Sequence, residues 1–112
     1  MYRTLIVARM RTDAAQPIAD IFGASDTTTD LPRLVGVQAR SLFQFGDLYL
    51  HLIDGERPVD QAVAQVQQHP AFQQISTDLR PYVSAYDPQT WREPKDAMAR
   101  EFYRWERERV AP

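Results

Sequence analysis

The sequence predicts a single α+β domain over residues 1–112, built on an antiparallel sheet with helices against it. Two apolar runs flank the turn-forming pair Gly46-Asp47, which indicates a β-hairpin in the middle of the chain. Helical spacing of apolar residues occurs both before and after that hairpin. A strand-like run stands near the start and another follows the second helical region. At 112 residues the chain is long enough for one core but not for two.

The first quarter of the chain predicts a strand followed by a helix. We expect the strand from Tyr2 to Met10, because its centre is continuously apolar. Thr12-Asp13 offers a helix cap, and Ala14 to Ala24 places its large apolar side chains on one face. Pro17 favours a start of the regular helix at that residue instead. In both cases we expect Gly23 to end the helix.

The segment SDTTTDLP, Ser25 to Pro32, is expected to be a polar loop, because its side chains readily bond their own backbone. A solvent-exposed connector would explain this composition. The functional alternative is a loop that holds Ser25 or Asp26 over a pocket, although an aspartate near a helix end is usually a cap.

The hairpin spans Gly36 to Asp54, and the alternation of side chains along its strands separates two faces. A two-residue turn would pair Phe45 with Leu48 and continue this register along both strands. One face is then almost wholly apolar and is expected to be the core face: Phe43, Phe45, Leu48, Leu50 and Leu52. The other is polar and aromatic: Gln38, Arg40, Leu42, Gln44, Tyr49, His51 and Ile53. Arg40 and His51 would be diagonal neighbours, roughly 7–8 Å apart between strand positions.

The second half predicts a broken helix and a short strand. Glu56-Arg57-Pro58 opens the helix, and His69-Pro70 breaks it because the residue before a proline leaves the α region. More helix follows, with Phe72, Ile75 and Leu79 as its apolar side, and Tyr82 to Tyr86 reads as a strand. The tail is ambiguous: Ala97 to Val110 has the composition of a helix, but alternating residues also fit an exposed strand.

This order of elements is the split βαβ arrangement of ferredoxin-like folds. Right-handed connections would place the first and third strands side by side at the centre of the sheet. Helices on one face leave the other face uncovered. Because an apolar open face usually marks a subunit contact, we expect a homodimer.

Composition argues against several classes of function. The net charge is −2 with thirteen basic and fifteen acidic residues interspersed, so we expect no nucleic-acid partner. Cysteine is absent, which removes disulfides, thiolate metal sites and a cysteine nucleophile. Neither a metal-ligand spacing nor a glycine-rich phosphate loop is present, so we expect no metal and no cofactor. No apolar run approaches a membrane span or a signal peptide, and we expect a cytoplasmic protein without a membrane partner.

His51 and Arg40 are the leading candidates for chemistry. The pKa of an imidazole suits proton transfer near neutrality, although a lone histidine on a sheet is more often structural. A guanidinium beside it would keep His51 neutral, and Arg40 itself would polarise a carbonyl or hold an enolate. Arg9 could reach the same cavity or pair with an acidic neighbour. We name Asp26 as a further catalytic candidate.

Several stretches resemble a known family: YRTLIVARM, DTTTDLP, GVQARSLFQFGDLYLHLI, HPAFQQI and WREPKDAMAREFYRW. Together they cover essentially the whole chain and are similar to the aromatic polyketide cyclases of the tetracenomycin cyclase family. The resemblance implies a ferredoxin-like fold that dimerises into an α+β barrel, without metal or cofactor. The implied activity is closure of a late ring on an aromatic polyketide intermediate by intramolecular aldol condensation and loss of water.

The resemblance also places Arg40, His51 and Asp26 at the family's polar pocket positions. The better-studied member has a histidine directly before this aspartate, where this chain has Ser25, so His51 is the nearest imidazole. We expect substrate contacts from Arg9, Ser25 and Tyr49. For the tail the resemblance favours a strand near Arg100 to Trp105, and we adopt that interpretation.

We therefore expect His51 to remove a proton next to a ketone while Arg40 stabilises the enolate oxygen. The carbanion would attack a second carbonyl of the same molecule, and dehydration would complete the aromatic ring. Two alternatives are a cofactor-independent monooxygenase of an anthrone-like polyketide and a non-catalytic domain that binds small molecules.

Overall fold

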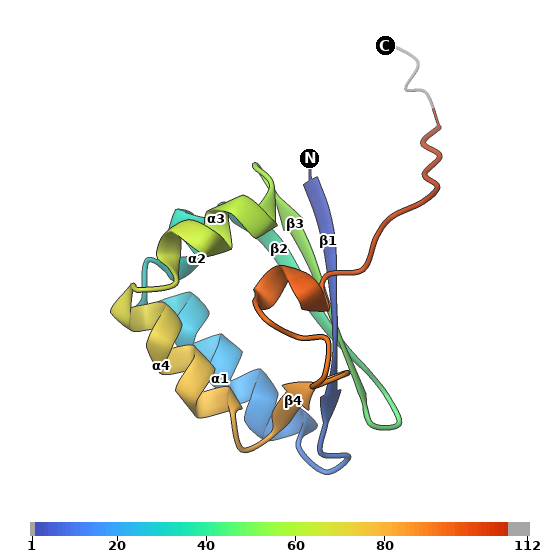
Figure 1. Ribbon diagram of the computed structural model, residues 1–112. Coiled ribbons are helices and arrows are strands. Elements are labelled where there is room, and N and C mark those ends of the chain that lie inside the picture. Colours follow the sequence, from blue (N-terminus) through green and yellow to red (C-terminus); the bar gives the residue numbers. More distant parts are fainter. Residues whose placement is uncertain (1, 108–112) are drawn as a thin grey trace.

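The computed structural model describes residues 2–107 and shows a four-stranded antiparallel sheet with all its α-helices on one face (Figure 1). The strand order is β2-β3-β1-β4, so the expected central position of the first and third strands is confirmed. The elements follow in the order β1 (Tyr2–Met10), α1 (Ala15–Thr28), α2 (Leu31–Val35), β2 (Val37–Phe45), β3 (Leu48–Gly55), α3 (Val59–Val66), α4 (Pro70–Leu79), β4 (Val83–Ala85) and the 3-10 helix η1 (Pro94–Ala97).

The central hairpin has the predicted register. Phe45 pairs with Leu48, and the ladder continues to Arg40 opposite Ile53. Gly46 turns the chain with φ of 61°, a left-handed conformation that glycine adopts without steric cost. The broken second helix is also confirmed, with His69 capping α4 through its ring nitrogen Nδ1, which accepts from the backbone N–H of Ala71 at 3.0 Å.

The expected core face of the hairpin was wrong. Alternate residues of β3, among them Tyr49, His51 and Ile53, are buried beneath the helices. The leucine-rich face points away from the helical layer, and Phe45 on that face is 77% exposed. The physical reason is that a sheet of four strands offers two faces, and alternation along the hairpin does not say which of them the helices cover.

The first helix is longer than predicted, because it continues through Gly23 to Thr28. Its end is held by side-chain bonds back to the previous turn. The hydroxyls of Thr27 and Thr28 donate to the carbonyls of Gly23 and Ala24 at 2.8 and 2.6 Å. The expected polar loop is therefore mostly helical, shared between α1 and α2. Asp13 was also wrong as a cap, since it pairs with Arg11 and Ala14 precedes the helix without a side-chain cap.

The tail is neither the helix nor the strand that the sequence suggested. After η1, Met98 makes one bridge with Ile6, and the backbone N–H of Ala99 donates to Leu5 at 2.8 Å. Residues 100–107 then run away from the body without regular structure, so the strand expected near Arg100 to Trp105 is not formed (Figure 1). Beyond Ala99 the chain does not continue to pair along β1. The part of the predicted tail helix beyond residue 107 lies outside the described residues.

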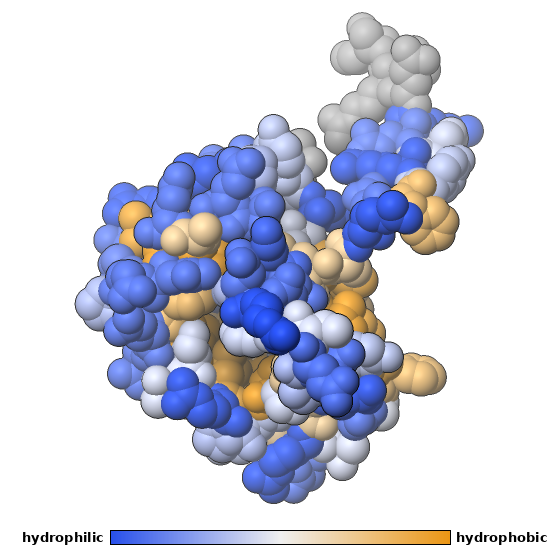
Figure 2. All heavy atoms as spheres, in the orientation of Figure 1, coloured by the Kyte–Doolittle hydropathy of each residue, from blue (hydrophilic) through white to orange (hydrophobic). Residues whose placement is uncertain are grey.

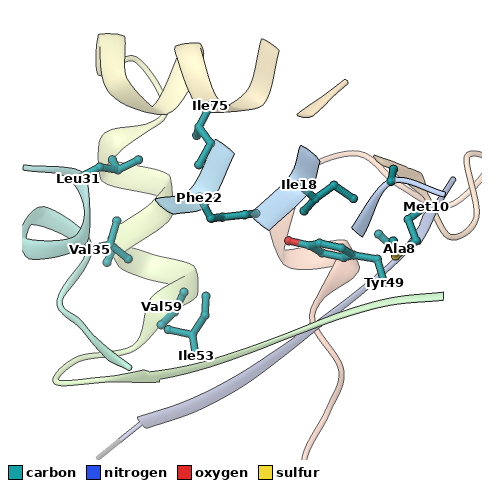
Figure 3. Packing of buried hydrophobic residues seen from close by; sticks show 12 residues of the cluster. Ala8, Met10, Ile18, Phe22, Leu31, Val35, Tyr49, Ile53, Val59 and Ile75 are labelled. Atoms are coloured by element: carbon teal, nitrogen blue, oxygen red, sulfur yellow. The ribbon is translucent and has the colours of Figure 1, made fainter. Parts of the chain in front are cut away.

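The core lies between the sheet and the helices. Ile18 and Phe22 of α1 point down onto Tyr49 and Ala8 of the sheet, and Val59 closes the far end against Ile53 (Figure 3). Within residues 2–107, no helix is long and apolar enough to cross a membrane.

Candidate functional site

A cavity of about 300 Å³ lies between the sheet and the helical layer. Its walls are predominantly apolar, and Figure 2 shows hydrophobic side chains at the bottom of a hollow between the helices and the segment that holds η1. Aromatic walls come from Phe22, Phe72 and Trp91. Polar side chains enter this cavity from five positions: Ser25, Arg40, Tyr49, His51 and Ser76.

The guanidinium of Arg40 is held by a carboxylate from the last turn of α1. Its Nε and Nη2 atoms donate to the two oxygens of Asp26 at 2.9 and 2.8 Å. Such a paired geometry fixes the plane of the guanidinium. The Arg40 side chain is only 16% exposed, and its Cζ lies 4.9 Å from the ring centre of Phe22. The extension of α1 beyond Gly23 is what brings Asp26 to this position.

Two further contacts join Arg40 to the buried face of β3. Nη1 of Arg40 lies 2.9 Å from Nε2 of His51, and Nδ1 of His51 lies 3.0 Å from the hydroxyl oxygen of Tyr49. The rings of Phe22 and Tyr49 both meet the imidazole edge-to-face, with centres 5.0 and 5.9 Å away. One chain of hydrogen bonds thus runs from the protein surface into the cavity, through Asp26, Arg40, His51 and Tyr49.

Burial controls the ionisation of His51 and Tyr49 in this chain of hydrogen bonds. The His51 side chain is almost completely enclosed, and its burial, followed by the nearby charge of Arg40, lowers the pKa of the imidazole to about 3. Burial raises the pKa of the Tyr49 phenol, an effect that the charge of Arg40 partly opposes. At neutral pH the site therefore holds a cation, a neutral imidazole and a neutral phenol.

This arrangement favours holding an oxygen over removing a proton. A guanidinium can only donate, so Nε2 of His51 accepts from Arg40 and has no lone pair left for a substrate proton. A base role for His51 would require that contact to break. Donors beside an apolar cavity suit a carbonyl oxygen that gains negative charge.

The structure brings together five of the six residues that the sequence singled out. Arg40, Tyr49, His51 and Ser25 line the cavity, and Asp26 reaches it through Arg40. Arg9 lies elsewhere. It is on the opposite face of β1 from Ala8, where it pairs with Asp47 at 3.1 Å and stacks on the ring of Tyr86.

Sequence reasoning missed Ser76 and the cavity role of Trp91. Ser76 follows Ile75 in the apolar pattern of α4, and only the packing of that helix shows which side faces the cavity. Trp91 was not among the predicted site residues, because no periodic pattern surrounds it. Among residues 2–107, no group of three or more His, Cys, Asp or Glu side chains could hold a metal ion.

Comparison with known proteins decides the family. The family model described as polyketide synthesis cyclase matches residues 2–106. The chain belongs to the polyketide synthesis cyclase family. Polyketide synthase CurG of Streptomyces cyaneus is 54% identical, over 96% of this chain and 100% of that protein. Tetracenomycin F2 cyclase of Streptomyces glaucescens is 40% identical, over 93% and 94% of the two chains.

The solved structure of tetracenomycin F2 cyclase superposes on this polyketide cyclase with a TM-score of 0.88, at 39% identity, and covers 96% of this chain and 100% of the other. The ferredoxin-like fold and the enzyme class that the sequence suggested are confirmed. A solved structure from Chloroflexus aurantiacus, described as an antibiotic biosynthesis monooxygenase, has a TM-score of 0.54 at 14% identity. That likeness shows a shared fold alone.

Proposed function

We propose that this polyketide cyclase closes a late ring of an aromatic polyketide intermediate by intramolecular aldol condensation followed by dehydration. The observation that carries the proposal is an apolar cavity of about 300 Å³ whose charged group is a single fixed guanidinium, that of Arg40. Apolar and aromatic walls suit a partly cyclised, partly aromatic substrate. One cation at the wall suits the oxygen of a ketone or its enolate.

The walls supply much of the rate in this mechanism. A poly-β-ketone has many reactive positions, and a cavity that holds two of them in contact selects one ring. Well-oriented intramolecular reactions gain on the order of 7–11 kcal/mol from such positioning. Phe22, Phe72 and Trp91 are placed to hold the flat part of the substrate.

In this mechanism Arg40 stabilises the negative charge that develops on a substrate oxygen. A proton leaves the methylene next to a ketone, and the enolate oxygen takes a hydrogen bond from one of the guanidinium N–H groups that Asp26 and His51 do not use. The enolate carbon then bonds to a second carbonyl carbon, whose oxygen takes up a proton. Loss of that hydroxyl as water, with a second proton from the ring, gives the aromatic product. Because Nε2 of His51 accepts from Arg40, we propose that the first proton passes to solvent water at the mouth of the cavity.

The direct test is incubation of the purified protein with polyketide intermediates of defined ring number, followed by mass spectrometry. Loss of one water from one intermediate is the expected outcome.

We expect Arg40→Met to lower the rate by about a hundredfold, because such a donor stabilises the charge that develops in the transition state. Arg11→Met is the matched control, since Arg11 pairs with Asp13 on the surface away from the cavity. Full activity of Arg40→Met would reduce the site to a shape-selecting pocket. Uptake of oxygen would indicate the monooxygenase instead.

We also propose that the protein forms a homodimer through the open face of the sheet. Seven apolar side chains share this face: Leu5, Val7, Phe43, Phe45, Leu48, Leu50 and Leu52. Phe43 and Phe45 are 53% and 77% exposed, and a contiguous exposed apolar patch usually marks an interaction surface. A twofold partner would cover the face with the same face of a second copy.

The cytoplasmic location stays a prediction that cell fractionation can test.

A further inference from the structure

Hydrogen bonds link Asp26, Arg40, His51 and Tyr49 in turn. In each of these bonds, chemistry fixes which group donates and which accepts. Each N–H of Arg40 is a donor, and a guanidinium has no acceptor. The contact of 2.9 Å between Nη1 and Nε2 of His51 is therefore a bond in which the imidazole accepts. A neutral imidazole carries one hydrogen, and with Nε2 accepting, that hydrogen is on Nδ1.

The next contact follows from that assignment. Nδ1 of His51 lies 3.0 Å from the Tyr49 oxygen and donates to it. The hydroxyl hydrogen of Tyr49 is then not used by the imidazole. Among the hydrogen bonds of residues 2–107, the Tyr49 hydroxyl has no second partner, and Tyr49 lines the cavity. Figure 3 shows its oxygen directed toward the α1 side of the core, next to Phe22.

We propose that the Tyr49 hydroxyl is a second hydrogen-bond donor, besides Arg40, to an enolate or phenolate oxygen of the substrate, with His51 as the residue that positions it. This deepens the proposed cyclase function and rests on it for the identity of the substrate. The ligand class is an anionic or strongly polarised oxygen on a flat, largely apolar molecule.

Two features make this hydroxyl a strong donor. The chain of bonds begins at a cation, and each bond polarises the next in the same direction. The apolar walls keep water away, so a donor here is stronger than in bulk solvent. The hydroxyl keeps its proton at neutral pH, because burial raises the pKa of Tyr49. The edge-to-face contacts of the imidazole with Phe22 and Tyr49 hold the rings in place.

The direction of the chain can be tested without any substrate. Nitrogen-15 NMR of the histidine side chains in the full protein distinguishes a protonated ring nitrogen from an accepting one. We expect His51 to carry its hydrogen on Nδ1, and to show no protonation between about pH 5 and 8, the range in which an ordinary histidine titrates. A His69→Gln variant assigns the signals. A hydrogen on Nε2, or protonation of His51 within that range, would overturn the proposal.

The donor role is tested with Tyr49→Phe, which keeps the ring and removes the hydroxyl. The probe is a hydroxyanthraquinone, a flat aromatic phenol whose absorption reports its ionisation. In the wild-type protein we expect the ionisation constant of the bound probe to be about tenfold larger than in Tyr49→Phe, as for a hydrogen bond to a charged group. Tyr86→Phe is the matched control, because Tyr86 lies outside the cavity and stacks on Arg9. Equal ionisation in wild type and Tyr49→Phe would contradict the proposal.

Turnover supplies the third readout. With a polyketide that the wild type cyclises, Tyr49→Phe should lower kcat by about a hundredfold, as expected for removal of one oxyanion donor, and change KM little. An unchanged kcat would overturn the catalytic role. If the wild type cyclises none of the polyketides, the cyclase proposal fails, while the NMR and probe measurements still decide whether Tyr49 is a donor to an anionic oxygen.

Discussion

His51 is a histidine that the folded protein keeps neutral. Its imidazole is buried under α1 and receives a hydrogen bond from Arg40. Protonation would place two cations in contact within an apolar layer, and both effects lower the pKa to about 3. The residue therefore suits a fixed hydrogen-bonding role, and its burial makes the stability of the protein depend on pH.

We expect the free energy of unfolding to fall as the pH falls below about 6.5, the pKa of an unfolded histidine. Between that value and the folded pKa of about 3, the unfolded chain binds a proton that the folded protein excludes. The contribution of His51 is fully present above pH 6.5 and is lost as the pH falls, by at most about 1.4 kcal/mol per unit. Urea unfolding at several pH values measures it.

The variant His51→Gln provides the comparison. Its unfolding free energy should fall less than that of the wild type, with a difference of about 2 kcal/mol between pH 7 and pH 5. Identical slopes in wild type and His51→Gln would show that the imidazole is not held neutral.

At the scale of elements, local sequence predicts those parts whose geometry is set by neighbours in the chain. The hairpin register follows from Gly46-Asp47 and was predicted correctly from Phe45–Leu48 to Arg40–Ile53, while the bulge between Val37 and Ala39 was not predicted. The end of α1 was missed because Gly23 ordinarily stops a helix, whereas three threonines return their hydroxyls to the last turn. The contact between Arg40 and His51 could be predicted, because alternation of side chains along the two strands places both on one face. The face that the helices cover, the place of Ser76 and the path of the tail depend on packing between distant segments.

Two glycines give a matched prediction about local geometry. Gly46→Ala should lower the unfolding free energy by about 1 kcal/mol, because φ of 61° at this turn is unfavourable for a residue with a Cβ. Gly23→Ala should raise it by about 0.5–1 kcal/mol, because the residue is inside a helix and its new methyl meets open space. Urea unfolding of both variants gives the signs, and equal signs would contradict one of the two assignments.

At the scale of the whole molecule, the sheet has two different surfaces. One is covered by helices and holds the cavity, and the other presents leucines and phenylalanines to solvent. The tail leaves the body at one end of the sheet, where Tyr103 and Trp105 are 76% and 69% exposed (Figure 1). Burial of the open face stabilises a subunit contact by about 25 cal/mol for each Å² removed from water.

We expect the wild-type protein to sediment as a dimer and Leu50→Glu to sediment as a monomer. The charge would stand in the middle of the open face, opposite Phe43 on β2 and Val7 on β1. Gln61→Glu adds the same charge on the exposed side of α3 and should leave the dimer intact. Analytical ultracentrifugation over a range of concentrations gives the association constant. A monomeric wild type at every concentration would remove the proposal.

The alternation along β3 has a consequence for how the sequence can change. Odd-numbered positions from Tyr49 to Ile53 form the floor of the cavity, while the leucines between them face outward. A substitution at a cavity position can therefore alter ligand preference without changing the outer surface. A substitution at the neighbouring leucine can change the outer surface and leave the cavity as it is. Insertion or deletion of a single residue within β3 would exchange both at once, with leucines entering the cavity and Tyr49 and His51 turned outward. Divergence within this strand should thus proceed by replacement at constant length, and tolerated changes in length should be confined to the segments that join the elements.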